Sequence, residues 1–244
     1  MYTAFAAVYD RLMRDVDYEA WARHYARLLA GAHVHGGNVC ECACGTGSLT
    51  LPLRRLGYRM TGVDLSRDML SQAAQKARDA GLEIPFVCQD MCHLQLHRRQ
   101  DGVNYLTTPD RARRFFRAAY AQLKPGGALI FDVSTPEKLS GTLGDHTLGC
   151  QEEDISYIWQ NAYHPRTRTV DMRLSIFVGD ADGRYQRLEE TQTQRAHTLE
   201  ELTKYLAEAG FADIRAYGKL TLRAPRPGDE RWHIRAIRPK ENAK

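Results

Sequence analysis

A chain of 244 residues with a formal net charge of +4, 43% hydrophobic and 26% charged residues, has an ordinary globular composition. It is long enough for one α/β domain with an added element, and its mild charge argues against a nucleic-acid-binding platform. No apolar run reaches the length of a membrane span, and the first residues lack a signal peptide's charged start, so we expect a cytoplasmic protein without a membrane partner.

Two helices are predicted at the start of the chain. Apolar residues recur at helical spacing in residues 2–13, and Asp17 is a typical N-cap for a second helix that continues to about residue 30. The spacing alone predicts only a pair of packing helices.

A short apolar stretch, residues 39–44, then leads into the turn Gly45-Thr46-Gly47, which is followed by a helix start. The stretch reads as a strand buried on both faces, in which three alternating cysteines (Cys40, Cys42 and Cys44) are small buried side chains rather than metal ligands. Glycines on both sides of Thr46 allow a sharp turn and close approach of a ligand. Open α/β sheets bind ligands at such a strand-to-helix junction.

The next predicted strand, residues 60–64, ends in Asp64, where an acidic side chain can accept hydrogen bonds from both hydroxyls of a ribose. A dinucleotide site has a third glycine for the pyrophosphate, but here Leu49 and Thr50 follow the turn. Glu41 precedes the turn and would repel a pyrophosphate, whereas it suits a ligand that carries an ammonium or sulfonium group. The pattern therefore favours S-adenosylmethionine over NAD.

Over about residues 2–237 the chain resembles the class I S-adenosylmethionine-dependent methyltransferases, because it has four of their motifs in the family's order. The motifs are Glu41-Cys42-Ala43-Cys44-Gly45-Thr46-Gly47, Gly62-Val63-Asp64-Leu65-Ser66, Cys88-Gln89-Asp90-Met91 and Leu123-Lys124-Pro125-Gly126-Gly127. The resemblance implies an α/β fold with a Rossmann-like doubly wound sheet and S-adenosylmethionine as cofactor.

The resemblance also implies the cofactor-binding residues. Glu41 and the backbone from Ala43 through Cys44, Gly45 and Thr46 to Gly47 hold the methionine part, and Asp64 the ribose. Leu65 and Met69 pack on the adenine, Asp90 takes its exocyclic amine, and the Met91 backbone takes its ring edge. Family members that begin with Phe-Ala-x-x-Tyr-Asp fold the first helices over the cofactor, and Tyr9 would then point at the methionine carboxylate or the substrate. A core tyrosine is an equally good interpretation of Tyr9.

A helix over residues 66–80, capped by Ser66, and a strand over residues 83–88 complete this half. The fold then needs a fourth strand before the helix at residues 110–123, yet no apolar run of strand length follows Asp90. The pattern indicates a deletion of this strand between Arg99 and Asp101. A segment omitted from the sequence, a short substitute strand, or an impaired protein would each account for this.

The remaining elements follow from turn signals and alternation. A strand is expected over residues 128–133, a loop or short helix over 135–150, an antiparallel meander over 154–163, 169–178 and 184–195, a helix over 198–209, and strands over 211–217 and 232–237. This gives N-terminal lid helices in 1–30, a cofactor-binding domain in 31–133 and 196–238, and an inserted β substrate cover in 134–195.

The residues predicted to contact the methyl acceptor are Asn104, Tyr105, Trp159 and Tyr163. Tyr157, Trp159 and Tyr163 share one strand face, which suits either an aromatic wall over a cationic acceptor or packing on the main domain. No catalytic residue is assigned; a general base would be unnecessary if the acceptor were an amine that reacts as its free base.

The arginines in 111–117 read as a solvated helix face, so a small-molecule acceptor is expected and nucleic acid is not. A cofactor-binding protein without catalysis, an RNA methyltransferase and a nucleotide-dependent oxidoreductase stay open as alternatives. Oligomeric state cannot be read from the chain.

Overall fold

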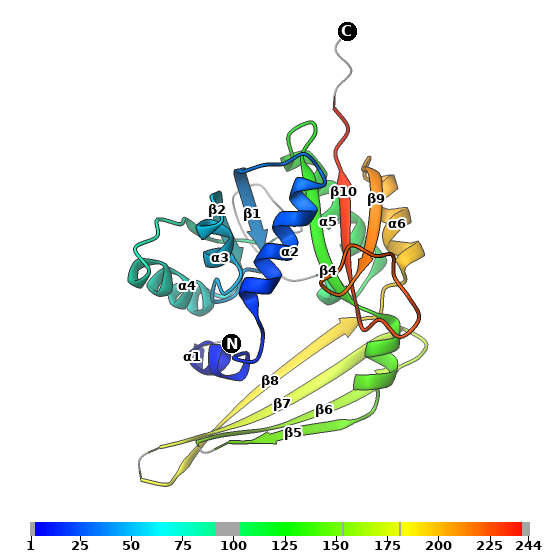
Figure 1. The fold of residues 1–244 in the computed structure, drawn as a ribbon. Coiled ribbons are helices and arrows are strands. Elements are labelled where there is room, and N and C mark those ends of the chain that lie inside the picture. Colours follow the sequence, from blue (N-terminus) through cyan, green and yellow to red (C-terminus); the bar gives the residue numbers. More distant parts are fainter. Residues whose placement is uncertain (1–2, 91–102, 153, 181, 241–244) are drawn as a thin grey trace.

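The computed structural model describes residues 3–90, 103–152, 154–180 and 182–240 (Figure 1). Residues in the gaps, among them Met91 and the segment between Arg99 and Asp101 where the fourth strand was expected, lie outside the described part. Within that part, no helix is both long and apolar enough to cross a bilayer.

Two helices open the described chain, α1 (Thr3–Leu12) and α2 (Tyr18–Ala30). Asp17 caps α2 as predicted, because its carboxylate accepts a hydrogen bond from the Ala20 backbone N–H at 2.8 Å. The buried face of α2 includes Ala22 and Leu29, which pack against the first sheet.

The first sheet is parallel and has the order β1-β2-β3. Its elements are β1 (Gly37–Cys42), α3 (Thr50–Arg55), β2 (Tyr58–Asp64), α4 (Arg67–Asp79) and β3 (Phe86–Cys88). Ser66 caps α4 as predicted, its hydroxyl accepting from the Met69 N–H at 3.2 Å. Because these connections are strand–helix–strand, the carboxyl ends of β1 and β2 come side by side at one edge.

Burial of β1 differs from the prediction. Cys44 is buried, whereas Cys40 is exposed, so the expectation of a strand buried on both faces is wrong for that position. Val39 packs into the apolar cluster beside α2. On the opposite face Cys42 packs against the cluster that contains Phe116 of α5, whereas Cys40, two residues earlier, is exposed.

The second sheet has the order β4-β10-β9, with β10 antiparallel to both neighbours. Its elements are η2 (Val103–Tyr105), α5 (Pro109–Gln122), β4 (Ala128–Ser134), α6 (Leu199–Glu208), β9 (Ala212–Gly218) and β10 (Arg231–Ile237). Thr198 and Glu201 form the capping box of α6. Phe116, Leu106, Leu206 and Ile234 are fully buried between these helices and strands and form the largest apolar cluster.

Among the described strands, none pairs with both β1 and β4, so the two sheets are not joined by a hydrogen-bonded ladder there. Helix α2 links them instead. The Tyr25 hydroxyl donates to Asp132 Oδ1 of β4 at 2.9 Å, and Ile130 of β4 packs into the cluster formed by Tyr58 and Met60 of β2.

An antiparallel sheet of order β5-β6-β7-β8 is inserted between β4 and α6 (Figure 1). Its elements are the π-helical segment η3 (Lys138–Leu143), β5 (Thr147–Gln151), β6 (Ile155–His164), β7 (Thr169–Gly179) and β8 (Tyr185–Arg195). The predicted meander is confirmed, but β5 was expected as loop or short helix. Its sequence contains Gly149 and few β-formers, so the edge strand depends on its pairing with β6.

A buried histidine pair lies between α2 and β10. The ring centroids of His24 and His233 are 4.4 Å apart, and both side chains are 0% exposed. His24 Nε2 and both ring nitrogens of His233 lack a hydrogen-bond partner among the described residues. Burial lowers the pKa of each histidine to about 4. Both rings are therefore neutral at pH 7.

We expect this pair to make the protein acid-sensitive. Because the folded-state pKa is depressed below the usual 6.5, the stabilisation is complete above pH 6.5 and is lost as the pH falls toward 4. The loss should be on the order of 2 kcal/mol per histidine. Urea unfolding of wild type and His24→Phe/His233→Phe between pH 7 and 4 measures it. If the free energy of unfolding of the double variant fell with pH as steeply as that of wild type, the assignment of the acid sensitivity to this pair would be contradicted.

Candidate active site

In the turn after β1, every second residue from position 43 to 47 has a left-handed backbone conformation. The φ angles are 57° at Ala43, 54° at Gly45 and 75° at Gly47. A Cβ at Gly47 would lie 3.1 Å from Leu51 Cδ1 and 3.2 Å from the Ala73 Cβ, so this glycine lets α3 and α4 pack closely. A Cβ at Gly45 would meet no described atom within 4 Å, so the space above Gly45 is open.

Asp64 lies directly beside this turn. Its Oδ2 accepts a hydrogen bond from the Gly45 N–H at 2.7 Å, and its Oδ1 accepts one from the Ser66 N–H at 2.9 Å. Each carboxylate oxygen keeps a further lone pair. Burial raises the pKa of Asp64, and the backbone donors oppose that shift. The carboxylate is thus fixed at the carboxyl end of β2, with acceptor capacity left for a ligand's hydroxyls.

Glu41 is half-buried on β1 before the turn. Its Oε2 accepts a hydrogen bond from the Thr50 hydroxyl of α3 at 2.5 Å. Burial raises the pKa of Glu41 to about 8, and the neighbouring Asp64 acts in the same direction. The group is therefore largely protonated at pH 7 unless a cation lies near it.

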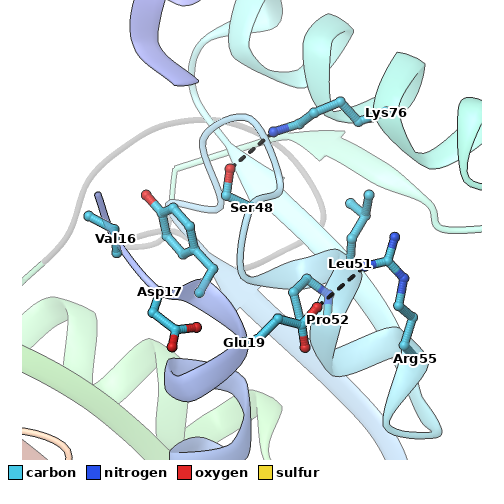
Figure 2. A pocket seen from close by; sticks show the side chains of 9 residues that line it. Val16, Asp17, Glu19, Ser48, Leu51, Pro52, Arg55 and Lys76 are labelled. Atoms are coloured by element: carbon cyan, nitrogen blue, oxygen red, sulfur yellow. Dashed lines mark hydrogen bonds and ion pairs between the residues drawn. The ribbon is translucent and has the colours of Figure 1, made fainter. Parts of the chain in front are cut away.

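Helix α1 is hydrogen-bonded to the glycine turn. Asp10 Oδ1 accepts from the Thr46 hydroxyl at 2.6 Å and from the Ser48 hydroxyl at 3.1 Å, and Lys76 Nζ donates to Asp10 Oδ2 at 2.7 Å. Figure 2 shows the Lys76 amine reaching Ser48. Asp10 closes the Phe-Ala-x-x-Tyr-Asp start and could have been found there, whereas no sequence signal marks Lys76.

Tyr9 is half-buried near Asp64. Its hydroxyl is hydrogen-bonded to Tyr18 at the start of α2, and burial raises its pKa, with a contribution from the negative charge of Asp64. The first helices therefore bring this tyrosine to the same edge of the sheet as the glycine turn. Tyr18 was not identified from the sequence.

The residues predicted for the adenine lie along β2, β3 and α4. The Gln89 N–H donates to the Asp64 carbonyl at 2.8 Å, which holds the ends of β2 and β3 together just before Leu65 and Asp90. Met69 is buried in the first turns of α4. Met91 lies outside the described residues.

An open hollow of about 400 Å³ lies beside the N-terminus of α2 (Figure 2). It is lined by Val16, Asp17, Tyr18, Glu19, Ser48, Leu51, Pro52, Arg55 and Lys76. Arg55 Nη1 pairs with Glu19 Oε1 at 3.4 Å across it. None of the residues predicted to bind the cofactor lines this hollow, so it is distinct from the space above Gly45.

The four residues predicted for the acceptor fall in two places. The amide of Asn104 donates to the carbonyls of Ser134 and Arg195 at 3.2 and 3.0 Å and accepts from the Ser134 N–H at 2.8 Å. The Tyr105 hydroxyl donates to Gln192 Oε1 of the inserted sheet. Trp159 and Tyr163 instead pack on the cluster around Leu139 of η3, away from η2.

Asn104→Ala is expected to lower the free energy of unfolding by about 3 kcal/mol, because it leaves buried backbone groups without partners. Urea unfolding measures the effect. Asn38→Ala, which removes an exposed amide on β1, is the matched control and should change stability by less than about 0.5 kcal/mol. Equal effects of the two substitutions would show that the Asn104 amide is not holding η2 in place.

Comparison with known proteins places this arrangement in a family. Residues 39–127, which contain Glu41, the glycine turn and Asp64, match the methyltransferase domain family. The chain is 34% identical over 248 residues to the "Putative methyltransferase YqeM" of Bacillus subtilis (strain 168), covering 98% of both chains. It also superimposes with a TM-score of 0.87 and 30% identity on an S-adenosylmethionine-dependent methyltransferase from Clostridium acetobutylicum, covering 98% and 99% of the two chains.

The chain is a class I S-adenosylmethionine-dependent methyltransferase. This confirms the resemblance, the Rossmann-like fold class and the enzyme class predicted from the sequence, and decides against the oxidoreductase alternative. The fold is shared more widely: CalS10 from Micromonospora echinaspora, solved with S-adenosylmethionine and described as an amino pentose methyltransferase, superimposes with a TM-score of 0.72 and 21% identity, covering 96% of both chains.

Proposed function

We propose that this methyltransferase binds S-adenosylmethionine between the glycine turn and Asp64 and methylates a small molecule. The observation that carries the proposal is the Asp64 carboxylate, which is fixed by the Gly45 and Ser66 amides and retains acceptor capacity beside the open space above Gly45. These features fit a ribose diol joined to an amino-acid moiety.

The charge of the site also fits this cofactor. Glu41 is a half-buried carboxyl group that is largely protonated at pH 7 in the absence of a cation, and a bound sulfonium or ammonium group would stabilise its ionised form. Bound there, S-adenosylmethionine supplies a methyl group already activated for transfer by its sulfonium. The chain then contributes binding and alignment, which are the main requirements for an in-line displacement.

We assign the parts of the chain accordingly. Residues 1–30 form a lid, residues 31–133 and 196–238 the cofactor-binding domain, and residues 134–195 a substrate cover. The contacts of Asp10 with Thr46, Ser48 and Lys76 support the lid, since they fasten α1 to the glycine turn. The contact of Tyr105 with Gln192 supports the cover, since it joins β8 to η2.

A small acceptor is supported by the packing of Arg113, one of the arginines of α5, within the protein. Arg113 pairs with Glu208 of α6 at 2.8 Å and lies over the Tyr205 ring, so this arginine is engaged in helix packing rather than displayed to a phosphate backbone. CalS10, which shares the fold, is described as acting on an amino pentose, which is a small molecule. Methyl transfer to RNA would contradict this part of the proposal.

Gly45→Ala tests the site separately from the fold. A methyl group at Gly45 meets no described atom, so we expect a stability loss of only about 1 kcal/mol from the left-handed backbone but at least a tenfold loss of S-adenosylhomocysteine affinity. Gly81→Ala at the end of α4 has a similar φ of 65° and equal space, and should lose the same stability and no affinity. Calorimetric titration that shows equal affinities would place the ligand elsewhere.

A further inference from the structure

The inner face of the inserted sheet carries a buried carboxylate that the proposed function leaves without a role. Glu190 of β8 is 5% exposed. Among the described residues, no group donates a hydrogen bond to it and no cation pairs with it. A carboxylate removed from water costs several kcal/mol unless a partner compensates it.

The position of Glu190 follows from strand alternation. Leu188 and Gln192, two residues away on either side, share its face. Leu188 packs in the cluster that contains Val8 of α1, and Gln192 Oε1 accepts the hydroxyl proton of Tyr105 in η2. Each lies about 7 Å from Glu190 along the strand. Glu190 is therefore placed between the proposed lid and the η2 turn. In the inserted sheet, β8 is the strand that lies next to α1 (Figure 1).

The surroundings of Glu190 on that face are apolar or neutral. Its partner across the strands is Leu174, and the neighbouring inward positions of β7 are occupied by Met172 and Ile176. The inward residues of β8 from 186 to 194 are otherwise leucine and glutamine. Burial raises the pKa of Glu190, as expected for a carboxyl group on such a face, and the positive charge of the chain's N-terminus only partly opposes that shift.

We propose that Glu190 recognises an amino group of the methyl acceptor, so that the enzyme acts on an amine-bearing small molecule. This inference rests on the proposed function. An ammonium group or an amine N–H placed beside Glu190 would supply the partner that the described residues do not, and Gln192 and Tyr105 would bound the same space. A hydroxyl acceptor would bring no positive charge to the carboxylate.

The test uses the full chain saturated with S-adenosylhomocysteine and pairs of primary amine and alcohol on one carbon skeleton: glucosamine and glucose, benzylamine and benzyl alcohol, cyclohexylamine and cyclohexanol. We expect at least one amine to bind at least tenfold more tightly than its alcohol. Glu190→Gln should abolish that preference. Glu189→Gln, on the exposed outer face and paired with Arg187, is the matched control and should retain it.

Binding is measured by calorimetry and thermal shift. Unfolding of Glu190→Gln without ligand checks the fold, and the variant should be at least as stable as wild type. If no pair shows an amine preference, or if the preference persists in Glu190→Gln, the inference is overturned. Titration with S-adenosylhomocysteine before any amine is added separates the two proposals. Absence of that binding overturns the proposed function, whereas normal binding without amine preference overturns only the role of Glu190.

Discussion

Asp64→Ala should reduce affinity for S-adenosylhomocysteine by at least about 100-fold. The substitution removes two hydrogen-bond acceptors for the ribose diol, and each charge-assisted hydrogen bond contributes roughly 1.5–3 kcal/mol. It also frees the Gly45 N–H, which the Asp64 carboxylate holds at 2.7 Å, so the glycine turn loses part of its support. Isothermal titration of S-adenosylhomocysteine into both proteins measures the change.

The control for this experiment is Asp79→Ala. Asp79 is an exposed carboxylate on α4 that accepts a hydrogen bond from Gln75, so its removal makes the same change in net charge away from the turn. Circular dichroism and thermal unfolding establish that the Asp64 variant is folded at the titration temperature. A folded Asp64→Ala protein with unchanged affinity would refute the assignment of the diol to this residue.

Glu41→Gln should have opposite effects on stability and on cofactor binding. The folded-state pKa of Glu41 is raised to about 8, so its contribution to stability is greatest below pH 4.5 and is lost as the pH rises through 8. The variant cannot ionise, so at pH 9 it should be more stable than wild type, by on the order of 2 kcal/mol. Below pH 4.5 the two proteins should be about equally stable.

The affinity of wild type for S-adenosylmethionine should rise with pH, whereas the contribution of Glu41 to stability falls. A cationic cofactor needs the ionised carboxylate, so wild-type affinity for S-adenosylmethionine should fall by up to about tenfold for each pH unit below 8. Glu41→Gln should bind weakly at every pH between 6 and 9. Glu83→Gln, at an exposed position before β3, should behave as wild type in both measurements. A pH-independent wild-type affinity would contradict a role for Glu41 in balancing the cofactor's charge.

Local chemistry made much of the fold predictable. Caps at Asp17 and Ser66 accept the hydrogen bonds expected of them, because a cap depends on residues three positions away. The glycine turn and the acidic strand end are likewise determined by short stretches, and the parallel arrangement of β1 and β2 then brings Asp64 to Gly45. Alternation alone was enough to place β6, β7 and β8.

Contacts between distant parts of the chain were less predictable. The sequence gives no sign that Asn104 hydrogen-bonds to Ser134 and Arg195, since all three groups meet only after η2 and β4 pack together. The edge strand β5 forms by pairing with β6 rather than by propensity. Lys76 and Glu190 look like surface charges in the sequence, and only the docking of α1 and the inserted sheet gives them their surroundings.

A crystal structure of the full chain with S-adenosylhomocysteine tests the cofactor site most directly. We expect both ribose hydroxyls within hydrogen-bonding distance of the Asp64 carboxylate and the amino-acid moiety against Gly45 and Gly47. Ligand bound in the hollow beside Arg55, or a ribose turned away from Asp64, would contradict the central claim that this carboxylate and the glycine turn form the cofactor site.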